Sequence, residues 1–156
     1  MSTHGFTINR TLNATPDLVY SAWTEAEHLE NWFANLPPEM PTTVDLRIGG
    51  AWRLQMRETE DRAYVTGGIY RELKPGARLS FTWGASGGFP DLDQLGEHAP
   101  LVTVTVTDVA GGTDLTVQVS LPAHLSEAEA QEWFDLGIEP GWHQTIDRLL
   151  TLPVTM

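Results

Sequence analysis

The chain has 156 residues, 41% of them hydrophobic and 19% charged, with six tryptophans, a composition that supports one packed domain and excludes an intrinsically disordered chain. It contains no cysteine, which excludes disulfides, thiolate metal sites and cysteine nucleophiles. The formal net charge is −12, and residues 84–156 carry eleven acidic side chains against the single basic Arg148. Nucleic acids and anionic membranes bind basic surfaces, so we expect neither as a partner.

The chain shows no targeting or membrane segment. Residues 1–5 contain neither a charged start nor an apolar run of signal length. No later stretch approaches the roughly 20 apolar residues that span a bilayer. We therefore expect a cytoplasmic protein.

The first elements are a strand and a helix. Apolar and polar residues alternate over residues 6–12, which is typical of a strand with one buried face. Thr15, Pro16 and Asp17 then supply a capping hydroxyl, a proline at the first helical position and an acid in the first turn. A helix should begin at this point.

A second, shorter helix is expected over residues 24–33. Thr24 and Glu27 have the spacing of a capping box, in which each side chain accepts a hydrogen bond from the other residue's backbone N–H. The side chains expected to point inward are apolar: Leu29, Trp32 and Phe33.

The middle of the chain predicts a meander of antiparallel strands. Glycine, proline and polar residues separate the apolar runs, which are expected as strands over 42–48, 51–58, 63–73 and 79–83. Gly67 and Gly68 interrupt the third of these strands and predict a bulge or a close backbone approach.

A loop and a long hairpin follow. Residues 84–100 are rich in glycine and acidic residues. They are expected to form either a lid over a cavity or a flexible surface loop. Valines alternate with polar residues in the strands expected over 102–106 and 115–121. Gly111 and Gly112 between them suit a tight turn with positive φ.

Two helices are expected at the C-terminus. Ser126 and Glu129 have the spacing of another capping box. Pro140 is expected to break the helix near residues 137–141, with a final helix resuming at Trp142. That helix carries an apolar stripe of Trp142, Ile146, Leu149 and Leu150. The order of elements predicts a single α+β domain over residues 1–156.

Several motifs carry a family resemblance in chain order: TPDLVYSAWT from Thr15, DLRIGGAW from Asp45, FTW from Phe81, GTDLT from Gly112 and GW from Gly141. They resemble the START-like (SRPBCC) superfamily, in its branch of homologues of the activator of the heat-shock protein 90 ATPase. The resemblance implies the helix-grip fold, a curved antiparallel sheet wrapped around a long C-terminal helix, with two short helices after the first strand. Members include lipid and hormone carriers, polyketide cyclases and many uncharacterised proteins.

A curved sheet around one helix encloses space, so we expect a cavity between the sheet and the C-terminal helix that binds a small hydrophobic or aromatic molecule, lipid- or polyketide-like. The alternative is that the same aromatic side chains fill a solid core. His143, on the flank of the final helix, could offer the ligand a polar contact or a proton. The residues expected to line the cavity are Trp32, Phe33, Trp52, Leu54, Met56, Phe81, Trp83, Trp142, His143 and Ile146.

Two other functions stay open at this level. A polyketide cyclase or hydrolase would need at least two ionisable groups converging in the cavity, and the candidates are His143, Tyr70 and an arginine. A co-chaperone-like interaction module would use the acidic C-terminal half to bind a basic protein partner. The chain is expected to be a monomer or a homodimer.

The sequence predicts no catalytic, metal or cofactor site. Residues 84–88 match the G-x-S-x-G pattern, but Phe89 and Pro90 follow where a nucleophile elbow would continue into a helix. Glu139 and His143 have i, i+4 spacing, but Pro140 lies between them and no third ligand is evident. A binding protein without catalytic activity is therefore favoured.

Overall fold

The computed structural model describes residues 5–32, 41–59, 61–85, 100–121, 126–135 and 137–151. Phe33 and residues 86–99, which make up most of the expected lid segment, lie outside the described residues. The elements are β1 (Gly5–Leu12), α1 (Pro16–Thr24), α2 (Ala26–Trp32), β2 (Thr43–Val44), β3 (Ala51–Thr59), β4 (Arg62–Lys74), β5 (Arg78–Thr82), β6 (Gly84–Ala85), β7 (Leu101–Val109), β8 (Gly112–Ser120), α3 (Glu127–Asp135) and α4 (Ile138–Thr151).

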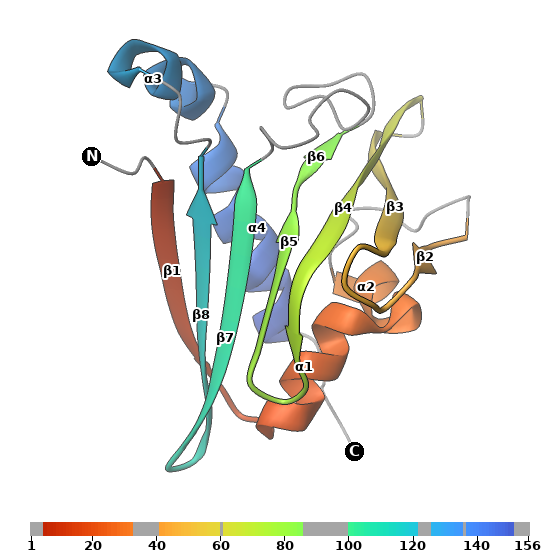
Figure 1. Cartoon of the computed structure of the whole chain (residues 1–156), viewed down its shortest axis with the longest axis vertical. Helices are drawn as coiled ribbons and strands as arrows, with labels where there is room; N and C mark the ends of the chain where they lie inside the picture. The colour runs from red at the N-terminus through yellow and green to blue at the C-terminus, as the bar shows by residue number, and fades with distance from the viewer. Residues whose placement is uncertain are drawn as a thin grey trace.

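The strands form one antiparallel sheet in the spatial order β1-β8-β7-β5-β4-β3-β2, with β6 paired to β4. The sheet is curved, and α1, α2 and α4 lie on the same side of it (Figure 1). The predicted helix-grip α+β fold is therefore confirmed. No helix in the described part of the chain is long and apolar enough to cross a membrane.

The long hairpin of β7 and β8 follows the predicted pattern. Val102, Val104 and Val106 are buried, and the residues between them are partly exposed. The turn joins Val109 to Gly112, with Gly111 at φ 86°. Side chains larger than hydrogen rarely adopt this conformation, so the glycine permits the two-residue turn.

The strand expected over residues 42–48 is largely wrong, because only Thr43–Val44 pairs with β3. The chain turns directly afterwards. The Arg47 side chain donates to Asp45 at 2.8 Å, and the Gly50 N–H donates to the Arg47 carbonyl, also at 2.8 Å. These local bonds satisfy backbone and side-chain groups that a continued strand would have paired with a neighbour.

Gly67 and Gly68 do not interrupt β4, which pairs with β3 on both sides of them. The predicted close approach is confirmed, because a Cβ on Gly68 would overlap the carbonyl oxygen of Thr82. The Thr82 hydroxyl accepts the backbone N–H of Ile69 at 2.8 Å. The two strands are thus drawn together just before Tyr70, which lies opposite Phe81.

Two of the three predicted helix caps are present. The Thr15 hydroxyl accepts the N–H of Leu18 at 3.3 Å at the start of α1. Ser126 and Glu129 form a reciprocal capping box at α3, with N–H to side-chain distances of 3.0 and 3.2 Å. Local sequence therefore sets where these two helices begin.

The capping box of Thr24 and Glu27 is wrong. Thr24 is the last residue of α1, and its hydroxyl donates to the Tyr20 carbonyl at 3.1 Å. Because α2 begins at Ala26, Glu25 rather than Thr24 directly precedes its first residue, and Thr24 is not in the capping position.

The break between the last two helices is shorter than predicted, because α4 begins at Ile138 rather than at Trp142. Pro140 lies within the first turn of α4, where a backbone N–H has no helical acceptor in any case. Gly137, with φ 83°, directly precedes the helix. Glu139 and His143 consequently share one helical face.

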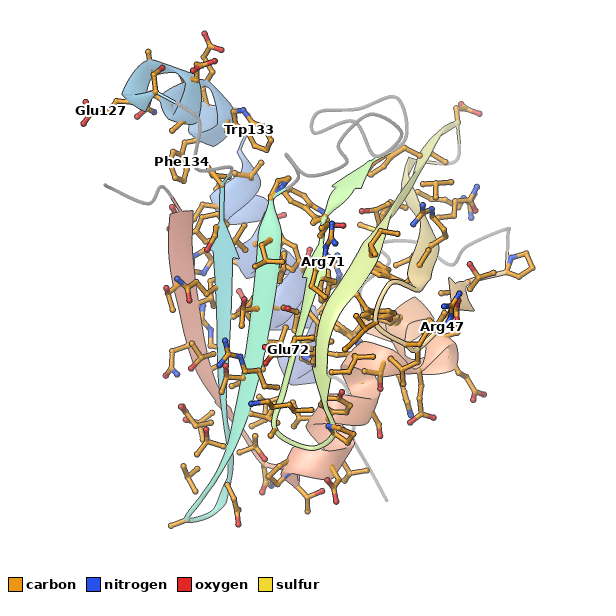
Figure 2. All side chains as sticks on the ribbon, viewed as in Figure 1. Arg47, Arg71, Glu72, Glu127, Trp133 and Phe134 are labelled. Atoms are coloured by element: carbon orange, nitrogen blue, oxygen red, sulfur yellow. The ribbon has the colours of Figure 1, made fainter. Side chains whose placement is uncertain are left out.

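Helix α3 packs at the end of the sheet beside α4 and forms a second, smaller core. Trp133 and Phe134 lie at the end of α3, close to the C-terminal end of β8 (Figure 2). The Phe134 ring is 6.3 Å from that of Phe6 on β1. Phe6 and Trp83 pack against both this small core and the main one between the sheet and the other helices.

Candidate functional site

The main core contains an enclosed set of side chains that we call the interior aromatic cluster. It brings together one residue each from α1, α2, β3, β4 and β5, and none of the five is more than 2% exposed. Its members are Trp23, Leu29, Trp52, Tyr70 and Phe81.

Phe81 is the centre of this cluster. Its ring lies 5.2 Å from that of Trp52 and 6.3 Å from those of Trp23 and Tyr70. The contacts with Trp52 and Tyr70 are edge-to-face, an arrangement that aromatic pairs prefer over a parallel sandwich. The cluster therefore presents both ring faces and ring edges to the space it surrounds.

The space within the cluster is divided into narrow interstices. They total about 190 Å³, and none is wide enough for a water molecule. None of the described residues that line this space comes from α4, so it is not the cavity expected between the sheet and the C-terminal helix. A guest would enter it only if the surrounding side chains moved apart.

The Tyr70 hydroxyl and the Trp23 indole N–H are polar groups buried in this cluster. Within the described part of the chain, neither the Tyr70 hydroxyl nor the Trp23 indole N–H has a hydrogen-bond partner. Most buried polar groups in proteins are paired, and leaving one unpaired costs about 1–3 kcal/mol. The two atoms are therefore the chemical feature that sets this part of the core apart from an ordinary apolar interior.

Burial raises the pKa of the Tyr70 hydroxyl, and the nearby Tyr20 raises it further. Burial also raises the pKa of Tyr20. Both phenols stay neutral in the folded protein at pH values where an unfolded tyrosine, with a pKa of about 10, begins to ionise.

Alkaline pH is therefore expected to destabilise the protein. The folded state holds these protons more tightly than the unfolded state. Their contribution to the free energy of unfolding is therefore fully present below about pH 10 and is lost as the pH rises above that value. One such tyrosine contributes a slope of about 1.4 kcal/mol per pH unit. Urea unfolding across this range should show a shallower decline for Tyr70→Phe than for the wild type, and equal slopes would contradict the assignment.

Several predicted site residues lie in or beside the interior aromatic cluster. Trp52 and Phe81 belong to it. Trp32 is fully buried next to it, with its ring 4.7 Å from that of Trp23 and its indole N–H donating to the Ala22 carbonyl at 2.8 Å. The Arg148 side chain donates to the Trp32 carbonyl at 3.0 Å and so joins α4 to the end of α2.

Other predicted residues lie in the core away from this space. Trp83 and Trp142 form an edge-to-face pair with ring centres 5.4 Å apart. Leu54 and Ile146 are buried, and Met56 packs against the core while half-buried. Their role as ligand contacts stays a prediction.

His143 lies on the flank of α4 beside β1. Its Nδ1 is 3.2 Å from Nη2 of Arg10, and its Nε2 is 3.7 Å from a carboxylate oxygen of Glu139. Because a guanidinium only donates, Nδ1 of His143 is the acceptor in its contact with Arg10. The described contacts of His143 thus involve polar groups at the helix flank.

Sequence reasoning missed three members of the cluster as site residues. Leu29 was expected to face inward, which gave a weak signal, but neither Leu29 nor Trp23 was assigned to the cavity. Tyr70 entered only as a possible ionisable group for an enzyme. A buried tyrosine can be suspected from strand alternation, but whether its hydroxyl has a partner depends on the tertiary packing.

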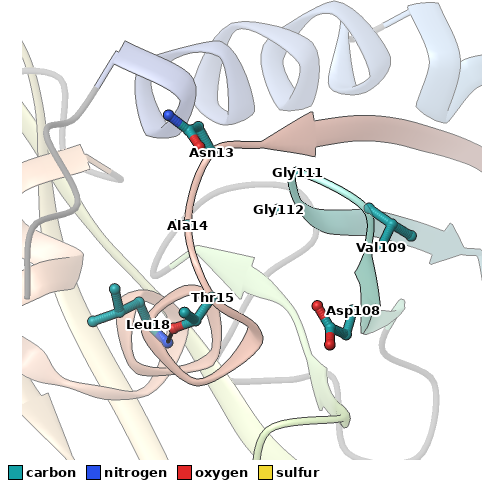
Figure 3. Close-up of a pocket in the computed structure, with 8 residues that line it drawn as sticks. All are labelled: Asn13, Ala14, Thr15, Leu18, Asp108, Val109, Gly111 and Gly112. Carbon is teal, nitrogen blue, oxygen red and sulfur yellow. Dashed lines mark hydrogen bonds between the residues drawn. The ribbon is translucent and has the colours of Figure 1, made fainter.

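A second hollow lies at the surface, between the segment linking β1 to α1 and the β7–β8 hairpin (Figure 3). It has a volume of about 510 Å³ and is open to solvent. Among the described residues that line it, Asp108 is the one ionisable side chain, and Thr15 already caps α1. Among the described residues, no group of three potential metal ligands is found here or elsewhere.

The fold and its aromatic interior define a helix-grip protein, and solved structures of the same shape exist. A protein from Chromobacterium violaceum is 23% identical, covering 98% of this chain and 99% of its own, with a TM-score of 0.70. One from Mycobacterium smegmatis is 22% identical, covering 100% and 99%, with a TM-score of 0.71. A protein of unknown function from Staphylococcus aureus is 20% identical, covering 94% and 91%, with a TM-score of 0.71.

The family model for Activator of Hsp90 ATPase homolog 1-like proteins matches residues 13–152. The chain belongs to this family, as its resemblance to the START-like (SRPBCC) superfamily implied. No protein with a curated description matches it.

Proposed function

We propose that this protein binds a small apolar or aromatic molecule, lipid- or polyketide-like, in its interior at the interior aromatic cluster. The observation that carries the proposal is the enclosed group of rings around Phe81 combined with two buried polar atoms that lack partners. Binding pockets for small molecules combine apolar, aromatic walls with a few polar groups, and this cluster has the same composition. The location proposed for this activity is the cytoplasm.

The ring arrangement supports a flat ligand. Phe81 makes edge-to-face contacts with Trp52 and Tyr70. An aromatic ligand could make contacts of the same kind with these rings, so the contacts it displaces would be replaced by similar ones. Helix α2 contributes Leu29 to the cluster and has only seven residues. A helix this short depends on its packing for stability, so the rings part by its displacement in this proposal.

The same geometry argues against acid–base catalysis. Of the side chains in the cluster, Tyr70 is the one ionisable group, and burial keeps it protonated. Acid–base catalysis of a cyclase or hydrolase requires groups that gain and lose protons near the working pH. The proposal is therefore binding without catalysis.

The test uses tetralin, a flat bicyclic hydrocarbon, and follows its binding through the melting temperature and tryptophan fluorescence. A ligand at one hundred times its Kd stabilises the folded state by about 2.7 kcal/mol, which raises the Tm of a chain this long by roughly 5–10 °C. Phe81→Leu removes the central ring and should weaken tetralin binding about tenfold.

Phe6→Leu is the matched control, because Phe6 packs on Phe134 in the second core rather than in the cluster. This variant should bind tetralin like the wild type. If tetralin leaves the Tm unchanged, or if both variants bind it equally well, the cluster is not the binding site.

A further inference from the structure

We infer that the molecule bound at the interior aromatic cluster carries a neutral hydrogen-bond acceptor, such as a ketone oxygen, that accepts hydrogen bonds from Tyr70 and Trp23. This inference rests on the proposed function and adds the chemistry by which the ligand is selected. It follows from the two buried polar atoms that lack partners in the described part of the chain.

The kind of polar group defines the complementary ligand atom. An indole N–H can only donate a hydrogen bond, and a phenol hydroxyl can donate as well as accept. Trp23 on α1 and Tyr70 on β4 line the same interior space from opposite sides, one from the helix layer and one from the sheet. A carbonyl oxygen has two lone pairs and can accept from both donors at once.

The acceptor is expected to be neutral. Of the described residues that line this space, none is a lysine, arginine or histidine, so a carboxylate or phosphate would have no counter-charge among them. Burial of an unpaired charge costs far more than one or two hydrogen bonds return. Fatty acids and phosphate esters are therefore poor candidates for this position, whereas ketones, aryl ketones and quinone-like rings fit it.

The unpaired donors also provide discrimination. A purely apolar guest leaves both donors buried and unsatisfied, whereas a guest with a well-placed acceptor satisfies them. Sites built to hydrogen-bond a substrate group reject analogues that lack it, because the partners in the site stay unpaired. The same two atoms that weaken the core of the free protein would thus select the ligand.

The test compares two probes with the same bicyclic skeleton, tetralin and its ketone α-tetralone, by calorimetry or fluorescence titration. The wild type should bind the ketone about tenfold more tightly than the hydrocarbon. Tyr70→Phe should reduce this preference to about threefold or less.

Tyr20→Phe is the matched control, because it removes a phenol hydroxyl from α1 that is outside the set lining the space. It should keep the wild-type preference for the ketone. Tyr70→Phe removes a buried unpaired hydroxyl, so its Tm should equal or exceed that of the wild type, which separates lost selectivity from lost folding. Trp23→Phe gives a second, independent loss of the preference.

Each outcome decides between the two proposals. Equal binding of ketone and hydrocarbon by the wild type overturns this inference and leaves the proposed function standing. A ketone preference that survives in both Tyr70→Phe and Trp23→Phe also overturns it. If the wild type binds neither probe, the proposed function fails and the inference fails with it.

Discussion

Gly68→Ala is expected to destabilise the protein by at least about 4 kcal/mol, an unusually large loss for a single methyl group. A Cβ at this position would overlap the carbonyl oxygen of Thr82 on the neighbouring strand. The obstacle is backbone rather than a flexible side chain, so relief requires β4 and β5 to separate. Urea denaturation followed by circular dichroism measures the loss.

Gly141→Ala is the matched control for this change. Gly141 lies in α4, and a Cβ built on it would meet no atom within 4 Å. Alanine has a higher helix propensity than glycine, so this variant should gain up to about 1 kcal/mol. A similar loss in both variants would show that the strand approach at Gly68 is not the cause.

Trp32→Ala is expected to cost about 3–5 kcal/mol, the usual range for removing a fully buried large aromatic side chain. The change removes the ring contact with Trp23 and the hydrogen bond from the indole to the Ala22 carbonyl. Since α2 has only seven residues, it depends on these contacts to stay folded. Hydrogen exchange should show faster exchange of the α2 amides, in addition to the lower unfolding free energy.

His28→Ala tests whether the effect belongs to the buried face of α2. His28 is on the same helix but exposed, and surface substitutions of this kind usually change stability by less than about 0.5 kcal/mol. A loss comparable to that of Trp32→Ala would indicate that α2 is sensitive to any change rather than to the loss of this anchor.

These two positions bear on the proposed binding site. Gly68 allows the close strand approach that precedes Tyr70 on β4, and Trp32 holds α2, which supplies Leu29. The interior aromatic cluster thus has a fixed wall on the sheet side and a wall on the helix side that depends on a few packing contacts. This asymmetry is consistent with entry of a ligand by movement of the helix layer.

Local patterns alone were enough for much of the fold. Alternation predicted the buried faces of β7 and β8, and the caps at Thr15 and Ser126 marked two helix starts correctly. These features succeed because they depend on residues within one turn or one strand. The errors at residues 45–48, Thr24 and Pro140 came from local bonds and turn positions that compete with the pattern.

The candidate site depended on long-range packing. Composition and alternation indicated aromatic residues inside the fold, including Trp52 and Phe81. The grouping of Trp23, Leu29 and Tyr70 with them required α1 and α2 to pack over β3, β4 and β5. Strand and helix periods specify which side of an element is buried, but not which side chain on another element it will meet. Whether the Tyr70 hydroxyl and the Trp23 N–H have hydrogen-bond partners depends on these contacts between elements, so only the folded structure shows that they lack them among the described residues.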